Sequence, residues 1–78
     1  MADMLGKIPP QSSEAEMAVL GAMLIEKEAV VRAIEILDSG DFYKSSHRAI
    51  YNAITELFSN NEPVDEITVV EKLSLIHI

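Results

Sequence analysis

The stretch Ile8–Leu24 constrains the fold more than any other part of this chain, because it joins a rigid lead-in, a helix start signal and the most apolar run. The prolines Pro9-Pro10 favour an extended approach. Ser13 and Glu16 have the spacing of a capping box, in which the serine hydroxyl accepts from the Glu16 amide and the glutamate carboxylate accepts from the Ser13 amide. The stretch therefore predicts a helix from Ser13 to about Ile25.

This first helix is apolar around most of its circumference. Its two neighbouring apolar stripes are Ala15, Ala18, Val19, Ala22 and Met23, and Met17, Leu20 and Leu24. A helix of this kind is buried on more than one side, so we place it at the centre of a helical domain. Gly21 lowers its helix propensity by about 1 kcal/mol. The missing side chain of this glycine either permits a close crossing with another helix or is simply tolerated at the surface. We favour the close crossing.

A charged segment, Glu26–Glu28, follows without Gly or Pro, so periodicity leaves open one long helix or two helices. One helix of about 25 residues would be long for a small domain, and we favour a break within this segment. The second helix then spans Lys27–Asp38. Its stop signal is Ser39-Gly40, which supplies a glycine where a left-handed C-terminal cap requires one.

Two further helices are predicted. The third begins at Ser45 or Ser46, either of which can cap it, and ends in the turn Ser59–Pro63. Thr68 and Glu71 form a second capping pattern, which predicts a fourth helix from Thr68 through Leu73. The inward residues are Ile50, Ala53, Ile54, Leu57 and Phe58 in the third helix, and Val69, Val70 and Leu73 in the fourth. The predicted fold class is therefore all-α, a small bundle of about four helices.

Length and charge limit the function classes. The 78 residues allow one domain, and a domain of this size buries only about 60–65% of its unfolded surface. The 13 acidic and 6 basic residues give a net charge of −7. Because phosphate binding needs clustered Lys and Arg, we expect no direct nucleic-acid binding by this segment. We interpret Lys44 and Arg48 as a solvated pair rather than a local basic patch.

No signal peptide or membrane-spanning run is predicted, and we expect a soluble intracellular protein. We also expect Met1–Lys7 to be a flexible tail and residues 8–74 to form the domain. The apolar end, Leu75–Ile78, is either an ordinary end to the fourth helix or a truncation or artificial tail, and we favour the second interpretation.

No catalytic, cofactor-binding or metal site is predicted. The glycines are isolated, which excludes a Gly-rich phosphate loop. His47 and His77 lie far apart without cysteine support, and we interpret His47 as a packed, neutral histidine rather than a ligand or general base. Glu14 and Glu16 resemble an acid–base pair only in sequence. Residues two apart on a helix point in different directions, so capping explains them better.

Phe42 and Tyr43 are the candidate site residues. Consecutive aromatic residues in a loop usually place one ring in the core and the other near the surface. We expect structural packing to be their main role. The alternative role is that one ring anchors a contact with another subunit or a partner protein, a common role for exposed tyrosine.

A set of motifs, in order and spacing, resembles the opening of the bacterial replicative DNA helicase of the DnaB family over about Ile8–Leu73. The motifs are Pro9-Pro10-Gln11, Glu14-Ala15-Glu16, Val19-Leu20-Gly21-Ala22-Met23-Leu24, Asp41-Phe42-Tyr43, His47-Arg48, Ile50-Tyr51, Ala53-Ile54, Leu57 and Pro63-Val64-Asp65. The resemblance implies the N-terminal helical domain of a hexameric helicase that unwinds DNA 5′ to 3′ with ATP. It also implies an incomplete domain, because the family's domain continues for further helices.

In that family the domain builds a collar on one face of the ring, its subunits associate in pairs, and primase docks on it. The collar also influences loading, so the implied partners are other subunits, primase and the helicase loader in the bacterial cytoplasm, at the replication fork. ATP and Mg²⁺ are implied only for the separate motor domain, and no ATP-binding position is carried over. The rival interpretations are a free-standing helical adaptor, a small DNA-binding domain and, most remotely, a small hydrolase using His47.

Overall fold

The computed structural model describes residues 12–76, which form an all-α fold. The helices are α2 (Ser13–Ile25), α3 (Lys27–Ile36), α4 (Ser45–Ser59) and α5 (Glu66–Ile76), and a 3-10 turn, η1 (Ser39–Asp41), precedes α4. No strand occurs within the described range, so the predicted small helical bundle is confirmed. The predicted tail Met1–Lys7, the lead-in Pro9-Pro10, and residues 77–78 lie outside the described residues.

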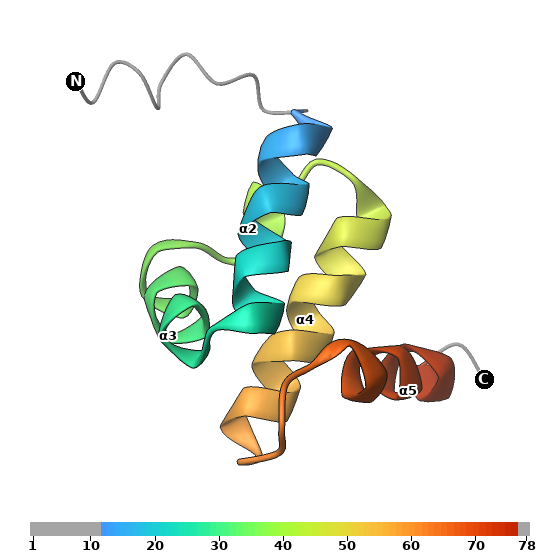
Figure 1. Ribbon diagram of the computed structural model, residues 1–78. Coiled ribbons are helices and arrows are strands. Elements are labelled where there is room, and N and C mark those ends of the chain that lie inside the picture. The colour runs from blue at the N-terminus through green and yellow to red at the C-terminus, as the bar shows by residue number, and fades with distance from the viewer. Residues whose placement is uncertain (1–11, 77–78) are drawn as a thin grey trace.

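Helices α2 and α4 run side by side through the middle of the fold, with α3 against α2 and α5 against one end of α4 (Figure 1). The buried apolar core comes from every helix and from the loop before α4: Leu20, Met23, Val30, Ala33, Phe42, Tyr51, Ala53, Ile54, Leu57 and Val69. The central position predicted for the first helix is confirmed, because it contacts both α3 and α4. The buried face of this helix is narrower than predicted, because Met17, Ala18 and Ala22 are exposed.

The predicted break after the first helix is confirmed and consists of one residue. Glu26 has extended backbone angles, φ −126° and ψ 127°, between two helices that contain no Gly or Pro at the junction. Its amide donates to the Ala22 carbonyl at 2.9 Å, and its carbonyl accepts from Ala29 at 3.1 Å. The turn brings Val30 and Ala33 back to the core beside Met23. Burial of these side chains therefore decides between the two arrangements that periodicity left open.

The end predicted for the second helix is wrong in two respects. Helix α3 stops at Ile36 rather than Asp38, and Gly40 has no positive φ, so it forms no left-handed cap. Two aspartates close this turn instead: the Asp38 carboxylate accepts from the Gly40 amide, and the Asp41 carboxylate accepts from the Asp38 amide, each at 2.9 Å. Because these side chains supply the acceptors, the turn does not need the backbone freedom of glycine.

The end of α4 follows its predicted turn chemistry. Asn61 has φ 60°, a left-handed conformation that asparagine tolerates. The Glu62 amide donates to the Leu57 carbonyl at 2.9 Å, and the Asn61 amide donates to the Phe58 carbonyl at 3.1 Å. This is the hydrogen-bond pattern of a Schellman motif, which satisfies the last carbonyls of the helix.

Helix α5 begins at Glu66, earlier than predicted, because its cap is not the Thr68–Glu71 pair. The Asp65 carboxylate accepts from the Thr68 amide at 2.9 Å, and the Thr68 hydroxyl accepts from the Asp65 amide at 3.0 Å. Val69 is buried and Leu73 is partly buried, as predicted. Val70 is exposed, which corrects the prediction. Residues 69 and 73 lie one above the other on a helix, and residue 70 is rotated by about 100° from residue 69.

The close helix crossing predicted at Gly21 is wrong. Within residues 12–76, and apart from the adjacent backbone of α2 itself, no atom lies within 4 Å of a Cβ atom built at this position. The glycine lies on a part of α2 that faces no neighbouring helix closely, so the surface interpretation is the correct one.

We predict that Leu20→Ala lowers the free energy of unfolding by about 2–5 kcal/mol, the usual effect of truncating a buried leucine. Leu20 is 4% exposed in the core. Ile25→Ala on the same helix is the control, because Ile25 is 82% exposed and surface changes usually stay within about 0.5 kcal/mol. Urea unfolding followed by circular dichroism measures both. Equal effects of the two variants would contradict this assignment of the core.

We predict that Gly21→Ala raises the free energy of unfolding by about 0.5–1 kcal/mol, because alanine favours the helix and loses less backbone entropy. The added methyl group has open space around it. The same unfolding experiment measures the change. A destabilised variant would show that a neighbouring segment approaches this position in solution.

Candidate protein-interaction site

The loop before α4 separates its two aromatic residues as predicted. Phe42 is 3% exposed, and its ring centroid lies 5.1 Å from that of Tyr51 in a tilted pair. Tyr43 is 65% exposed. Phe42 thus anchors the loop in the core, while the Tyr43 ring remains at the surface. Of the two candidate site residues, Tyr43 is the one that another protein can reach.

The Tyr51 ring packs against the Phe42 ring in the core. Its hydroxyl donates to the Leu37 carbonyl at 2.7 Å. Burial is the main cause that raises the pKa of Tyr51, and the carboxylates Asp38 and Asp41 raise it further. The hydroxyl therefore keeps its proton, and this hydrogen bond ties α4 to the end of α3.

Glu16 is the residue whose role the local pattern misidentified. The predicted capping box with Ser13 does not form, because Ser12 is the N-cap of α2 and its hydroxyl accepts from the Ala15 amide at 3.3 Å. The Glu16 carboxylate is buried and faces the start of α4. It accepts from the Tyr43 amide at 2.6 Å and from the Lys44 amide at 3.4 Å.

His47 supplies the third contact of this carboxylate. Its Nδ1 lies 2.7 Å from Glu16 Oε1, so Nδ1 carries the proton that the carboxylate accepts. The packed position predicted for His47 is confirmed, because the side chain is buried. Helix α4 starts at Ser45 as predicted, but its N-cap is Lys44 and neither serine caps it. Glu16 from α2 provides the negative charge at this helix end.

The three donors explain how a carboxylate can stay ionised in a buried place. The pKa of Glu16 lies below its ordinary value, chiefly because the Tyr43 amide donates to the carboxylate. Burial opposes this shift, while the hydrogen bonds from His47 and the Lys44 amide, and the charge of His47, add to it. A carboxylate that accepts several hydrogen bonds is stabilised in its charged form.

Arg48 binds the backbone carbonyl groups of the same loop. Its Nη1 donates to the Phe42 carbonyl at 2.9 Å and to the Tyr43 carbonyl at 2.7 Å. The solvated pair predicted for Lys44 and Arg48 is therefore wrong for Arg48, whose guanidinium group is bound to backbone. The Tyr43 ring projects from a loop whose amides are held by Glu16 and whose carbonyls are held by Arg48.

Across residues 12–76, no group of three or more His, Cys, Asp or Glu side chains could hold a metal ion. The His47 side chain is only 6% exposed, which leaves its ring little access to a substrate. No helix in the same range is long and apolar enough to cross a membrane.

We predict that Glu16→Gln lowers the melting temperature at pH 7, and that the difference from wild type shrinks as the pH falls. Because the folded pKa lies below the ordinary value of 4.5, Glu16 stabilises the fold above that value and ceases to do so as the pH drops through its folded pKa. Thermal unfolding at pH 7 and pH 3 measures this. Glu14→Gln on the exposed side of α2 is the matched control. A difference between Glu16→Gln and wild type that is independent of pH would show that the ionised carboxylate is not the stabilising group.

Comparisons with known proteins agree with this fold. The family model described as DnaB-like helicase N terminal domain matches residues 8–77. A replicative DNA helicase DnaB of Rhodothermus marinus is 54% identical over 68 residues, which cover 87% of this chain and 7% of the relative. The replicative DNA helicase DnaC of Bacillus subtilis is 47% identical over 75 residues, which cover 95% of this chain and 16% of the relative.

A solved structure extends the similarity to three dimensions. The N-terminal domain of DnaB helicase from Mycobacterium tuberculosis matches with a TM-score of 0.84 and 41% identity, over 90% of this chain and 49% of that chain. The chain thus spans about half of the solved domain and a small part of the curated relatives. These matches confirm the resemblance found in the sequence, and the chain belongs to the family of DnaB-like helicase N-terminal domains.

Proposed function

We propose that this chain forms part of the N-terminal collar of a hexameric replicative helicase, where it acts in subunit assembly and in the recruitment of primase and the helicase loader. The match of the N-terminal-domain family over residues 8–77 carries this proposal. The proposed extent of the collar domain is residues 8–74. Unwinding of DNA 5′ to 3′, with ATP and Mg²⁺, belongs in this proposal to the rest of the helicase. The proposed location is the cytoplasm, at the replication fork.

Tyr43 is the proposed contact residue of this domain. An aromatic side chain at an interface contributes most when it is fixed before binding, because less conformational entropy is then lost. The backbone beneath Tyr43 is held by Glu16 and Arg48, and Phe42 locks the loop into the core. The backbone that carries Tyr43 is therefore fixed, while its ring remains accessible to a subunit or partner.

The acidic charge of the chain also supports a role in protein contacts. With a net charge of −7, the surface repels the phosphate groups of DNA, whose binding requires clustered positive charge. One basic group near the site, Arg48, is already bound to the Phe42 and Tyr43 carbonyls.

We predict that Tyr43→Ala weakens self-association or primase binding by about tenfold or more, the effect of losing an aromatic anchor. Analytical ultracentrifugation at several concentrations measures the first, and binding to immobilised primase from the same organism measures the second. Tyr43→Phe, which keeps the ring, and Ile36→Ala, at an exposed position on α3, are controls. A chain that stays monomeric at high concentration and ignores primase would argue against the collar role. Unchanged affinities of Tyr43→Ala would remove only Tyr43 from the contact.

A further inference from the structure

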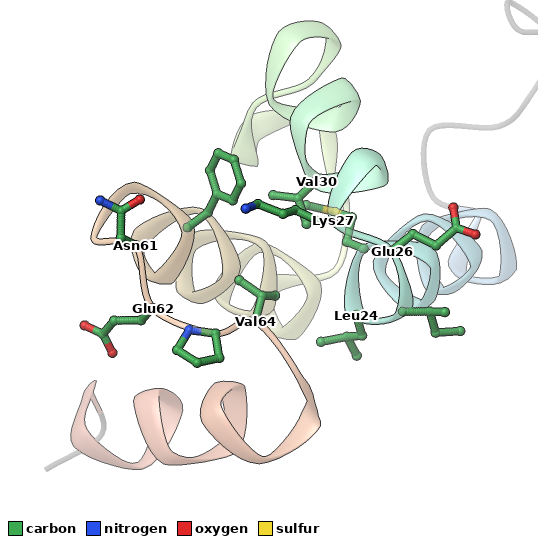
Figure 2. Close-up of a pocket in the computed structure, with 11 residues that line it drawn as sticks. Leu24, Glu26, Lys27, Val30, Asn61, Glu62 and Val64 are labelled. Carbon is green, nitrogen blue, oxygen red and sulfur yellow. The ribbon is translucent and has the colours of Figure 1, made fainter.

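A pocket of about 450 Å³ lies away from Tyr43, between the α2–α3 junction and the loop that joins α4 to α5. Figure 2 shows the apolar side chains Leu24, Val30 and Val64 in its middle part. Its volume falls within the range of about 300–1,000 Å³ that is common for binding pockets in proteins. An apolar side chain from a ligand can therefore be buried here.

The walls of this pocket are well defined. One wall follows the single extended residue Glu26, where the chain turns from α2 into α3. The opposite wall follows Asn61, whose left-handed conformation and Schellman hydrogen bonds fix the path of the loop. The side chain of Val30, which also lines the pocket, is fully buried. The pocket is thus built on backbone that is held by hydrogen bonds, so little ordering is needed when a ligand binds.

The charges around the pocket are predominantly negative. Glu26 and Glu62 lie on opposite sides of it, with Lys27 between them (Figure 2). The carboxyl ends of α2 and α4 also line it, and neither helix has a basic residue in its last turn. One helix amino end, that of α3, faces the same region. Two carboxylates and two negative helix ends thus outweigh one ammonium group and one positive helix end.

We propose that this pocket binds a segment of a partner protein that carries an apolar side chain between Lys or Arg residues. The apolar side chain fills the space near Leu24 and Val64, and the flanking cations meet Glu26 and Glu62. A second copy of this chain is a poor occupant of the pocket, because its six Lys and Arg residues are scattered along the sequence. The preference follows from the pocket itself and is independent of the role proposed for the collar.

The test uses a fluorescein-labelled peptide with a leucine pair between two lysine pairs, titrated against the 78-residue chain and followed by anisotropy. Two matched peptides replace the lysines by glutamates or the leucines by serines. We expect the lysine–leucine peptide alone to bind, more weakly as salt rises, and to shift amide resonances around the pocket in a ¹⁵N-labelled chain. Equal binding of the serine peptide, or resonance shifts spread over the whole acidic surface, would overturn the proposal.

Charge reversal separates the pocket from general attraction to an acidic protein. Glu62→Lys is expected to lower the affinity of the chain for the lysine–leucine peptide by about three- to tenfold. Lys27→Glu is expected to raise this affinity by a similar factor. Glu35→Lys, which makes the same change of charge at an exposed position outside the pocket, is the control. Circular dichroism verifies that each variant is folded. If Glu35→Lys weakens binding as much as Glu62→Lys, the peptide binds through overall charge and the proposal fails.

Discussion

The buried carboxylate of Glu16 is the interaction on which the arrangement of α2 and α4 depends. It lies on the first turn of one central helix and receives hydrogen bonds from the segment that starts the other. A single acidic side chain thereby performs two tasks: it satisfies backbone donors at a helix start that lacks its own cap, and it sets the register between two helices. A group bonded in this way is costly to leave unpaired, so alternative registers of the two helices are disfavoured.

The consequences of this contact reach the surface through the loop before α4. Phe42 packs on Tyr51 and Arg48 binds the loop carbonyls, so the loop is fastened by an apolar, a cationic and an anionic contact at once. Tyr43 is exposed at the point where these three contacts meet. The acidic pocket lies elsewhere, at the α2–α3 junction and the loop after α4. The domain therefore offers two distinct surfaces, one presented by the start of α4 and one by the loop that follows it.

The features that follow from local chemistry were predictable from the sequence, and those that depend on distant contacts were not. Helix α2 and a break within Glu26–Glu28 were predicted from apolar spacing and from the usual length of helices. The turn at Asn61 follows from nearby side chains and was also predicted. Glu16 was assigned to a capping box, because nothing local indicates that Tyr43, 27 residues away, would provide its donor. Gly40 is a local exception: its turn is closed by the nearby Asp38 and Asp41 side chains, and the Ser-Gly pattern was read as a left-handed cap instead.

For the candidate site, the sequence predicted only that one of the two adjacent aromatic rings is buried and the other exposed. Two adjacent aromatic residues in a loop indicate one inner and one outer ring, but not which is which, and the structure assigns the inner position to Phe42. The pocket gave no sequence signal, because its lining comes from segments that are far apart along the chain. Its carboxylates, Glu26 and Glu62, look like ordinary solvated charges until the fold places them on either side of Leu24 and Val64.

The single-residue break at Glu26 has a consequence for the order in which the domain folds. Glu26, Lys27 and Glu28 are all good helix formers, so local preference alone favours a continuous helix through this corner. The extended conformation of Glu26 is compensated only when Val30 and Ala33 reach the core beside Met23. The corner between α2 and α3 therefore forms together with the collapse of the core and not before it.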